Sequence, residues 1–156
     1  SNLRNQNLDW KSCHCFYFET ENRVIDEELI GLIPGKYLIN NLHYVNALTG
    51  GIKNIVSVTV VDDQGEKGQA LTKKVTAELN ELCGITTRSL LHSFQIPKAL
   101  PQLSNMQYEI PPSQTQLLDT VFLAGDVTLN GSLNAAMMAG EKAAEAVINK
   151  LEKSLM

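Results

Sequence analysis

Cysteine, aromatic residues and charge are all sparse in this chain of 156 residues. Aromatic residues make up 6% of the chain and charged residues 19%, slightly below the usual quarter. Basic and acidic residues are interspersed around a net charge of −4, without the basic stripe that nucleic-acid binding requires. The hydrophobic run around 55–61 is far too short to span a bilayer. Hydrophobic residues still make up 44%, enough for the core of one domain, or of one domain and a fragment.

The chain has three cysteines, an odd number. Cys13 and Cys15 lie two residues apart on an expected strand, where they point to the same side in a poor geometry for a mutual disulfide. Free thiols favour a reducing compartment, most simply the cytoplasm. His14 lies between them, and thiolates with imidazole can bind zinc. Because His14 points to the opposite side and no second pair of ligands follows, the sequence predicts no metal site.

Two catalytic motifs are also missing. There is no G-x-S-x-G elbow, so an α/β-hydrolase is not indicated. There is no C-x-x-C pair, which excludes the redox centre of the thioredoxin-reductase-like flavoproteins. No residue can be singled out from the sequence as catalytic.

Apolar periodicity predicts an α/β or, more closely, an α+β protein. A mixed β-sheet with one packed helix is followed by a short strand and a long helix. The expected strands cover 12–19, 37–41, 43–45, 54–61, 88–96 and 121–124, and the expected helices cover 69–82 and 132–153. Segments 24–32 and 100–120 are expected to be loops or extended connections, and Gly50-Gly51 to break the chain.

Both helices show apolar positions at helical spacing. In the first helix, Lys74 and Glu78 lie one turn apart on the polar side, and Gly84 suits the left-handed position that ends a helix. The stripe of the first helix consists of Leu71, Val75, Leu79 and Leu82. The final helix is expected to pack through a continuous seam of Leu133, Met137, Gly140, Ala144, Val147 and Leu151.

The segment Val121–Ile148 carries the strongest functional signal. An apolar strand runs into Gly125-Asp126, and Gly131-Ser132 precedes a helix rich in small residues. The start of a helix presents unpaired N–H groups and partial positive charge, which suit a polar cofactor. Taken singly, the same residues are also typical of ordinary turns, with Gly131 as a loop glycine and Ser132 as an N-cap.

As one ordered run, this segment resembles the C-terminal flavin-binding stretch of the FAD-dependent amine oxidase and phytoene desaturase (phytoene dehydrogenase-related) superfamily. The matching residues are Phe122, Leu123, Ala124, Gly125, Asp126, Gly131, Ser132, Ala136, Gly140, Ala143 and Ala144. Upstream, the stretch 96–102 is similar to a segment before the final strand in desaturase and protoporphyrinogen-oxidase relatives. The resemblance spans most of the chain but is specific only in the last third.

The resemblance implies a flavoprotein oxidoreductase that removes hydride from an apolar or amine substrate, with the desaturase branch the better match. It implies that residues 1–115 form a partial substrate-binding domain and 116–156 the C-terminal strand–helix portion of the FAD-binding domain. Asp126 would accept a hydrogen bond from a ribityl hydroxyl of FAD, and Gly125 would let the backbone approach. Gly131 and the N–H groups around Ser132, Leu133 and Asn134 would face the cofactor.

The family's N-terminal G-x-G-x-x-G is not present, and the chain begins Ser1-Asn2. The chain is therefore interpreted as a fragment of a larger cytoplasmic flavoprotein, inactive alone and binding FAD weakly or not at all. Surfaces left uncovered are expected to cause self-association through the sheet face or the last helix. The resemblance leaves room for peripheral membrane contact of the parent. The alternative is a stand-alone, non-catalytic module that binds a ligand or a protein.

Overall fold

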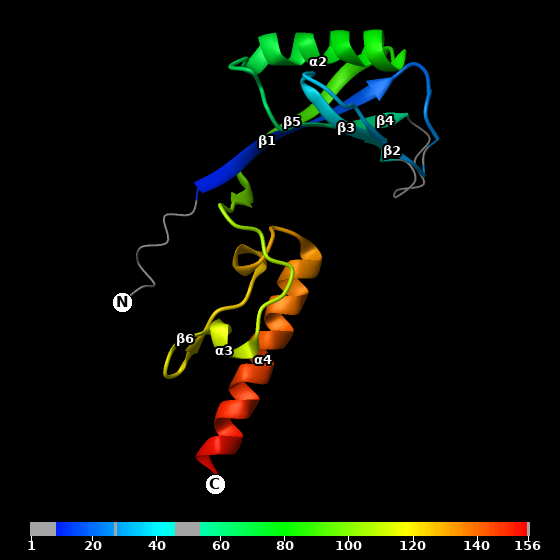
Figure 1. The fold of residues 1–156 in the computed structure, drawn as a ribbon. Coiled ribbons are helices and arrows are strands. Elements are labelled where there is room, and N and C mark those ends of the chain that lie inside the picture. The colour runs from blue at the N-terminus through cyan, green and yellow to red at the C-terminus, as the bar shows by residue number, and fades with distance from the viewer. Residues whose placement is uncertain (1–8, 27, 46–53, 156) are drawn as a thin grey trace. The chain divides into compact units, whose positions relative to one another are not determined.

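The computed structural model describes residues 9–26, 28–45 and 54–155, so the expected break at Gly50-Gly51 lies outside the described residues. The chain divides into two compact units (Figure 1). The sheet unit spans Ser12–Ala99, and the C-terminal unit combines Leu100–Met156 with the N-terminal end of the chain through Lys11. The predicted α+β class is confirmed.

A five-stranded sheet with the order β2-β3-β4-β1-β5 forms the framework of the sheet unit (Figure 1). β4 pairs antiparallel with both β1 and β3, and Phe16 lies opposite Val58. β1 is an interior strand, because it lies between β4 and β5. The strands are β1 (Asp9–Thr20), β2 (Ile30–Leu32), β3 (Ile39–Tyr44), β4 (Ile55–Val60) and β5 (Thr87–Gln102).

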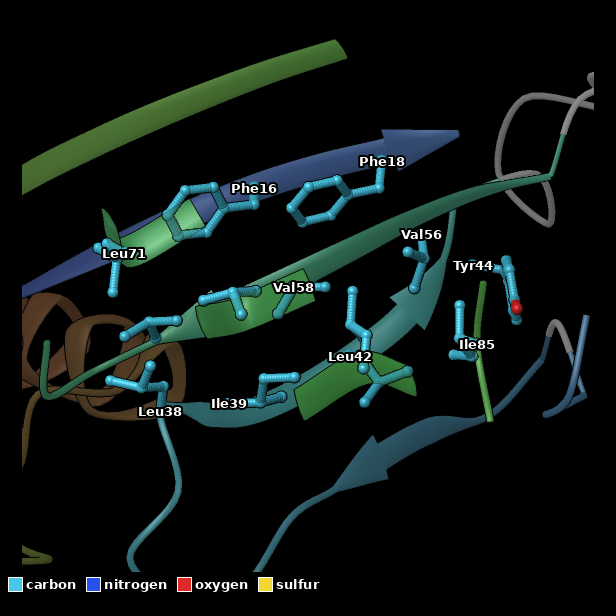
Figure 2. Packing of buried hydrophobic residues seen from close by; sticks show 13 residues of the cluster. Phe16, Phe18, Leu38, Ile39, Leu42, Tyr44, Val56, Val58, Leu71 and Ile85 are labelled. Atoms are coloured by element: carbon cyan, nitrogen blue, oxygen red, sulfur yellow. The ribbon is translucent and has the colours of Figure 1, made fainter. Parts of the chain in front are cut away.

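The core of the sheet unit lies between the sheet and helix α2 (Gly68–Cys83). β-branched side chains on alternate positions of β4 point to one face, and Val58 there is 0% exposed. Figure 2 shows these side chains meeting the phenylalanines of β1 and Leu71 of α2. Leu71, Val75 and Leu79 are buried as predicted, whereas Leu82 is 39% exposed. Gly84 ends the helix in the left-handed conformation at φ 66°, also as predicted.

The turn from β4 into α2 is built by two aspartates. The Asp62 carboxylate accepts a hydrogen bond from the N–H of Gln64 at 3.0 Å. The Asp63 carboxylate accepts one from the N–H of Gly65 at 3.0 Å and lies 3.3 Å from Nε2 of His14. Hydrogen bonds of this kind, from a nearby backbone N–H to an aspartate side chain, are typical of turns. The hydrogen bond from the Gly65 N–H lowers the pKa of the Asp63 carboxyl, and the nearby His14 shifts the pKa in the same direction.

This lowered pKa predicts an acid-sensitive turn. A carboxyl whose pKa is lower in the folded than in the unfolded state stabilises the fold above its ordinary value of 3.8, and that contribution is lost as the pH falls through the folded-state value. We therefore expect Asp63→Asn to be less stable than the wild type at neutral pH. The difference should shrink as the pH falls below about 4. Urea denaturation at a series of pH values measures it, and a constant difference would contradict the assignment.

Three sequence expectations about strands are corrected by the sheet. Segment 24–32 is not all loop, because its end forms β2, and the two strands expected at 37–41 and 43–45 are a single strand, β3. β5 continues through Pro97 and Pro101 to Gln102 instead of ending at the first proline. As β5 is an edge strand, it tolerates residues that lack an N–H group.

The C-terminal unit is built on one long helix, α4 (Leu133–Ser154). The connection 100–120 is not wholly extended, since it contains helix α3 (Pro112–Thr115). Strand β6 (Gln116–Leu118) follows this helix directly. β6 pairs with β7 (Val121–Phe122) as a separate two-stranded sheet, so the expected strand 121–124 is only two residues long. The 3-10 turn η2 (Asp126–Thr128) then leads toward α4 and packs on it.

The packing face predicted for the final helix is wrong. The buried residues of α4 are the alanines Ala135, Ala139, Ala143 and Ala146. Ala135 and Ala139 pack with Ile110 and Leu129, because small side chains allow the irregular chain before the helix to approach closely. Of the expected seam, Leu133 is 76% exposed and Met137 67%, so this seam forms the outer face of the helix.

Candidate functional site

The candidate site begins where β7 ends. The N–H of Leu123 donates to the carbonyl of Thr115 at 2.8 Å, which holds the end of this hairpin in place. Gly125 then adopts φ 133° and ψ 166°, a conformation that is essentially restricted to glycine. An added Cβ at Gly125 would meet no atom within 4 Å. Glycine is therefore required at this position for its backbone conformation, while the space beside it is open.

The chain after Gly125 folds back on itself. The carbonyl of Asp126 accepts hydrogen bonds from the N–H of Leu129 at 3.0 Å and of Gly131 at 3.2 Å. The carbonyl of Gly125 accepts from both the N–H and the hydroxyl of Thr128, at 3.2 and 2.7 Å. These bonds bring Asp126 beside the residue that precedes the N-cap of α4. The structure thus places Gly125, Asp126 and Gly131 in one tight turn.

Ser132 is the N-cap of α4. Its Oγ accepts a hydrogen bond from the N–H of Ala135 at 3.1 Å and donates one to Oδ1 of Asn130 at 2.7 Å. Nδ2 of Asn130 in turn donates to the carbonyl of Gln107 at 3.0 Å. The capping role that the sequence offered as the alternative for Ser132 is therefore confirmed. The role of Asn130 was missed, although an asparagine directly before a glycine is a common turn signal.

Among the described residues, the turn leaves hydrogen-bonding groups of Asp126, Leu133 and Asn134 unused. The Asp126 side chain is partly exposed and makes no hydrogen bond or ion pair with the residues that the structure describes. Within the same described residues, the N–H groups of Leu133 and Asn134 have no acceptor, as expected in the first turn of a helix. The free carboxylate can accept hydrogen bonds from the hydroxyls of a ligand. The two free N–H groups can donate to the electron-rich edge of a ligand.

The space beside this turn is small. A cavity of about 110 Å³ is lined by Lys11, Leu100, Pro101, Leu103, Met106, Asn130 and Gly131. A Cβ on Gly131 would approach the Pro101 ring at 3.4 Å, and φ is 62°, so this glycine is also required. Sites for drug-sized ligands enclose roughly 300–1,000 Å³. The cavity could accommodate only part of a large cofactor, and Asp126 does not line it.

A larger depression, of about 610 Å³, lies elsewhere in the C-terminal unit and was not anticipated from the sequence. It is lined by Glu109, Ile110, Pro111, Pro112, Met138, Glu141 and Lys142. Nζ of Lys142 lies 2.9 and 3.0 Å from the two carboxylate oxygens of Glu145, and this pairing raises the pKa of the lysine. Glu141 and Glu109 act in the same direction. Lys142 is therefore held in its charged form and is unsuited to act as a base.

The cysteines show no sign of catalytic activation. All three are free thiols. Burial, with Cys15 nearby, raises the pKa of Cys13, and burial together with Glu78 raises the pKa of Cys83. A raised pKa reduces the thiolate fraction on which nucleophilicity depends. Within the described ranges, no three metal-binding side chains gather at one place.

The comparisons with known proteins identify no family. The chain matches no protein-family model, and no curated protein is significantly similar to it. No helix in the described part of the chain combines the length and hydrophobicity needed to cross a membrane.

Proposed function

We propose that this chain is the C-terminal part of an FAD-dependent oxidoreductase resembling the phytoene desaturases and amine oxidases. In this proposal residues 116–156 belong to the FAD-binding domain and residues 1–115 to the substrate-binding domain. These boundaries divide the chain by function. They differ from those of the two compact units, which are defined by packing. The nucleotide-binding G-x-G-x-x-G strand and helix would be supplied by the remainder of the parent protein.

The observation that supports the proposal is the turn that folds Asp126 back onto Gly131. Its two hydrogen bonds to the Asp126 carbonyl hold the backbone of this acidic residue beside the start of α4. The Asp126 carboxylate and the N–H groups of Leu133 and Asn134 have no partner in the described part of the chain. The hydroxyls of a cofactor chain would donate to an acceptor such as this carboxylate. The edge of a flavin ring would accept from donors such as these N–H groups.

Each residue would have a limited role toward FAD. Asp126 would accept a hydrogen bond from a ribityl hydroxyl, and the conformation of Gly125 would keep the approach free of a side chain. Ser132 would orient the first turn of α4 through its cap. The positive end of the helix would stabilise negative charge near it by about 0.3–2 kcal/mol, enough to modulate a redox potential but not to set it. Bound FAD would supply the hydride acceptor for an apolar or amine substrate.

The second candidate is a stand-alone, non-catalytic module that binds a protein or an apolar ligand. The apolar outer face of α4 favours it, because large exposed apolar surfaces often mark interaction sites. The coding sequence upstream distinguishes the two candidates. A G-x-G-x-x-G motif in frame supports the oxidoreductase, whereas a start codon near Leu3 supports the module.

The test of the proposed site is FAD affinity. In the parent protein, we expect Asp126→Ala to weaken FAD binding about 10- to 100-fold, because one hydrogen bond to a charged acceptor contributes about 1.5–3 kcal/mol. Asp126→Asn retains a neutral acceptor and should lose less. Titration of apoprotein with FAD, followed by quenching of flavin fluorescence, measures both affinities.

Glu152→Ala is the matched control, because it removes an exposed carboxylate near the other end of α4. Its FAD affinity should equal that of the wild type. Equal affinity of Asp126→Ala and wild type would refute the site assignment, and a parent protein without flavin absorbance would refute the proposed function. The 156-residue chain alone should bind FAD weakly or not at all.

A further inference from the structure

The outer face of α4 carries a regular apolar seam that the C-terminal unit does not use. The seam residues follow one another at alternating spacings of four and three, the pattern by which two helices pack side by side. Leu151 in this seam is 60% exposed. The outer seam consists of Leu133, Met137, Gly140, Ala144, Val147 and Leu151.

No contact within the C-terminal unit explains why residue 140 is a glycine. It lies in the middle of a 22-residue helix, where glycine is less stable than alanine. A Cβ built at this position meets no atom within 4 Å, so nothing in the described part of the chain requires its absence. Ala136 and Ala144 lie one turn to either side. Small residues at this spacing let a second helix approach closely, which would explain the glycine.

The outer seam is also symmetric about Lys142. Leu133 and Leu151 lie nine residues before and after this position, Met137 and Val147 five, and Gly140 and Ala144 two. When two such helices run antiparallel around a two-fold axis, leucine meets leucine at both ends. Methionine meets valine further in, and small residues meet at the centre. The seam is therefore complementary to itself, as a two-fold interface must be.

We propose that the outer seam of α4 binds the outer seam of a second copy of this chain, in an antiparallel helix pair whose two-fold axis crosses the seam at the height of position 142. The occupant is a second copy because the seam matches itself in both side-chain size and spacing. The proposal involves no flavin, so it does not depend on the proposed function. The interface is confined to one helix of about 33 Å, which makes a concentration-dependent dimer the expected state.

The charges beside the seam distinguish the antiparallel pair from a parallel one. Glu141 borders the outer seam at its centre and is exposed. In the antiparallel pair the two copies of Glu141 approach each other across the axis and repel, whereas in a parallel pair they lie on opposite sides of the interface. Removing this charge with Glu141→Gln should therefore tighten the antiparallel dimer by a few-fold, consistent with an exposed charge pair.

Sedimentation equilibrium of the 156-residue chain over a range of concentrations tests the dimer. We expect a monomer–dimer equilibrium, with Met137→Glu raising the dissociation constant at least about tenfold because each copy buries a charge in the seam. Asn149→Glu adds the same charge to the same helix away from the seam and should leave the equilibrium unchanged. Circular dichroism confirms that both variants keep their helix. A wild-type chain that is monomeric at every concentration, or a Met137→Glu chain that dimerises normally, would overturn the proposal.

Disulfide trapping tests the orientation. In the antiparallel pair, position 133 of one copy faces position 151 of the other, while the two copies of position 133 are about 27 Å apart. A mixture of Leu133→Cys and Leu151→Cys chains should therefore form mixed disulfides under mild oxidation, identified by peptide mass. The wild-type chain gives the background from its three native cysteines. Efficient linkage of Leu133→Cys to itself would instead show a parallel pair and overturn the assignment.

Discussion

Phe18→Ala is expected to lower the free energy of unfolding of the sheet unit by about 3–5 kcal/mol, the usual cost of removing a buried aromatic ring. Phe18 is 1% exposed and lies on the interior strand β1, opposite Val56 of β4. Its ring lies 6.0 Å from that of Phe16. Because neighbours on two strands and α2 are fixed around this site, they can collapse only partly into the space left by the ring. Urea denaturation followed by circular dichroism measures the loss.

Tyr17→Ala is the matched control for this substitution. Tyr17 is the next residue on β1 and therefore points to the opposite face of the sheet. Its ring meets the edge of Phe94 at 6.1 Å, but both side chains are accessible to solvent. The loss of stability should be clearly smaller than for Phe18→Ala. Equal losses would contradict the conclusion that the core lies only between the sheet and α2.

Glu78→Ala is expected to destabilise the sheet unit by about 2–4 kcal/mol, because it leaves two buried N–H groups without an acceptor. The two oxygens of the Glu78 carboxylate accept hydrogen bonds from the N–H of Leu38 at 3.1 Å and of Ile39 at 3.0 Å. Both of these residues are almost fully buried. Glu78→Gln keeps one acceptor oxygen and should lose roughly half as much. Chemical denaturation measures the stabilities of both variants.

Amide exchange gives a local readout of the same contact. The amides of Leu38 and Ile39 should exchange faster in Glu78→Ala than in the wild type, because the bonds that protect them are lost. Glu81→Ala, an exposed position one turn later on α2, should change neither stability nor exchange. Unchanged protection of Leu38 and Ile39 in Glu78→Ala would show that the carboxylate does not anchor β3.

The contact made by Glu78 also shows where local sequence rules end. Lys74 and Glu78 lie one turn apart on the helix, although in the weaker order for a pair. In the structure Lys74 pairs with Glu66, and Glu78 reaches the start of β3. An i,i+4 rule describes only partners on the same helix. It cannot include a backbone donor that the fold brings from forty residues away.

Local chemistry was sufficient to predict several features from the sequence. β4 follows from its β-branched residues, and the three buried residues of the α2 stripe follow from helical spacing. The turn after β4 depends on aspartates that bond to nearby N–H groups, and Gly84 and Ser132 act within one turn of their helix ends. Each of these features involves partners only a few residues apart, which is why the sequence determined them.

Tertiary structure decided which face of α4 is buried and how β5 tolerates its prolines. α4 has an alanine face and, on its other side, the outer seam. The spacing of residues along the helix is compatible with burial of either face. Only the path of the preceding chain, which needs close approach around Ile110 and Leu129, selects the alanines. The proximity of Asp126 to Gly131 likewise depends on a backbone fold that residue types do not specify. These outcomes depend on contacts between segments, so the physical information that decides them is the arrangement of the chain in space.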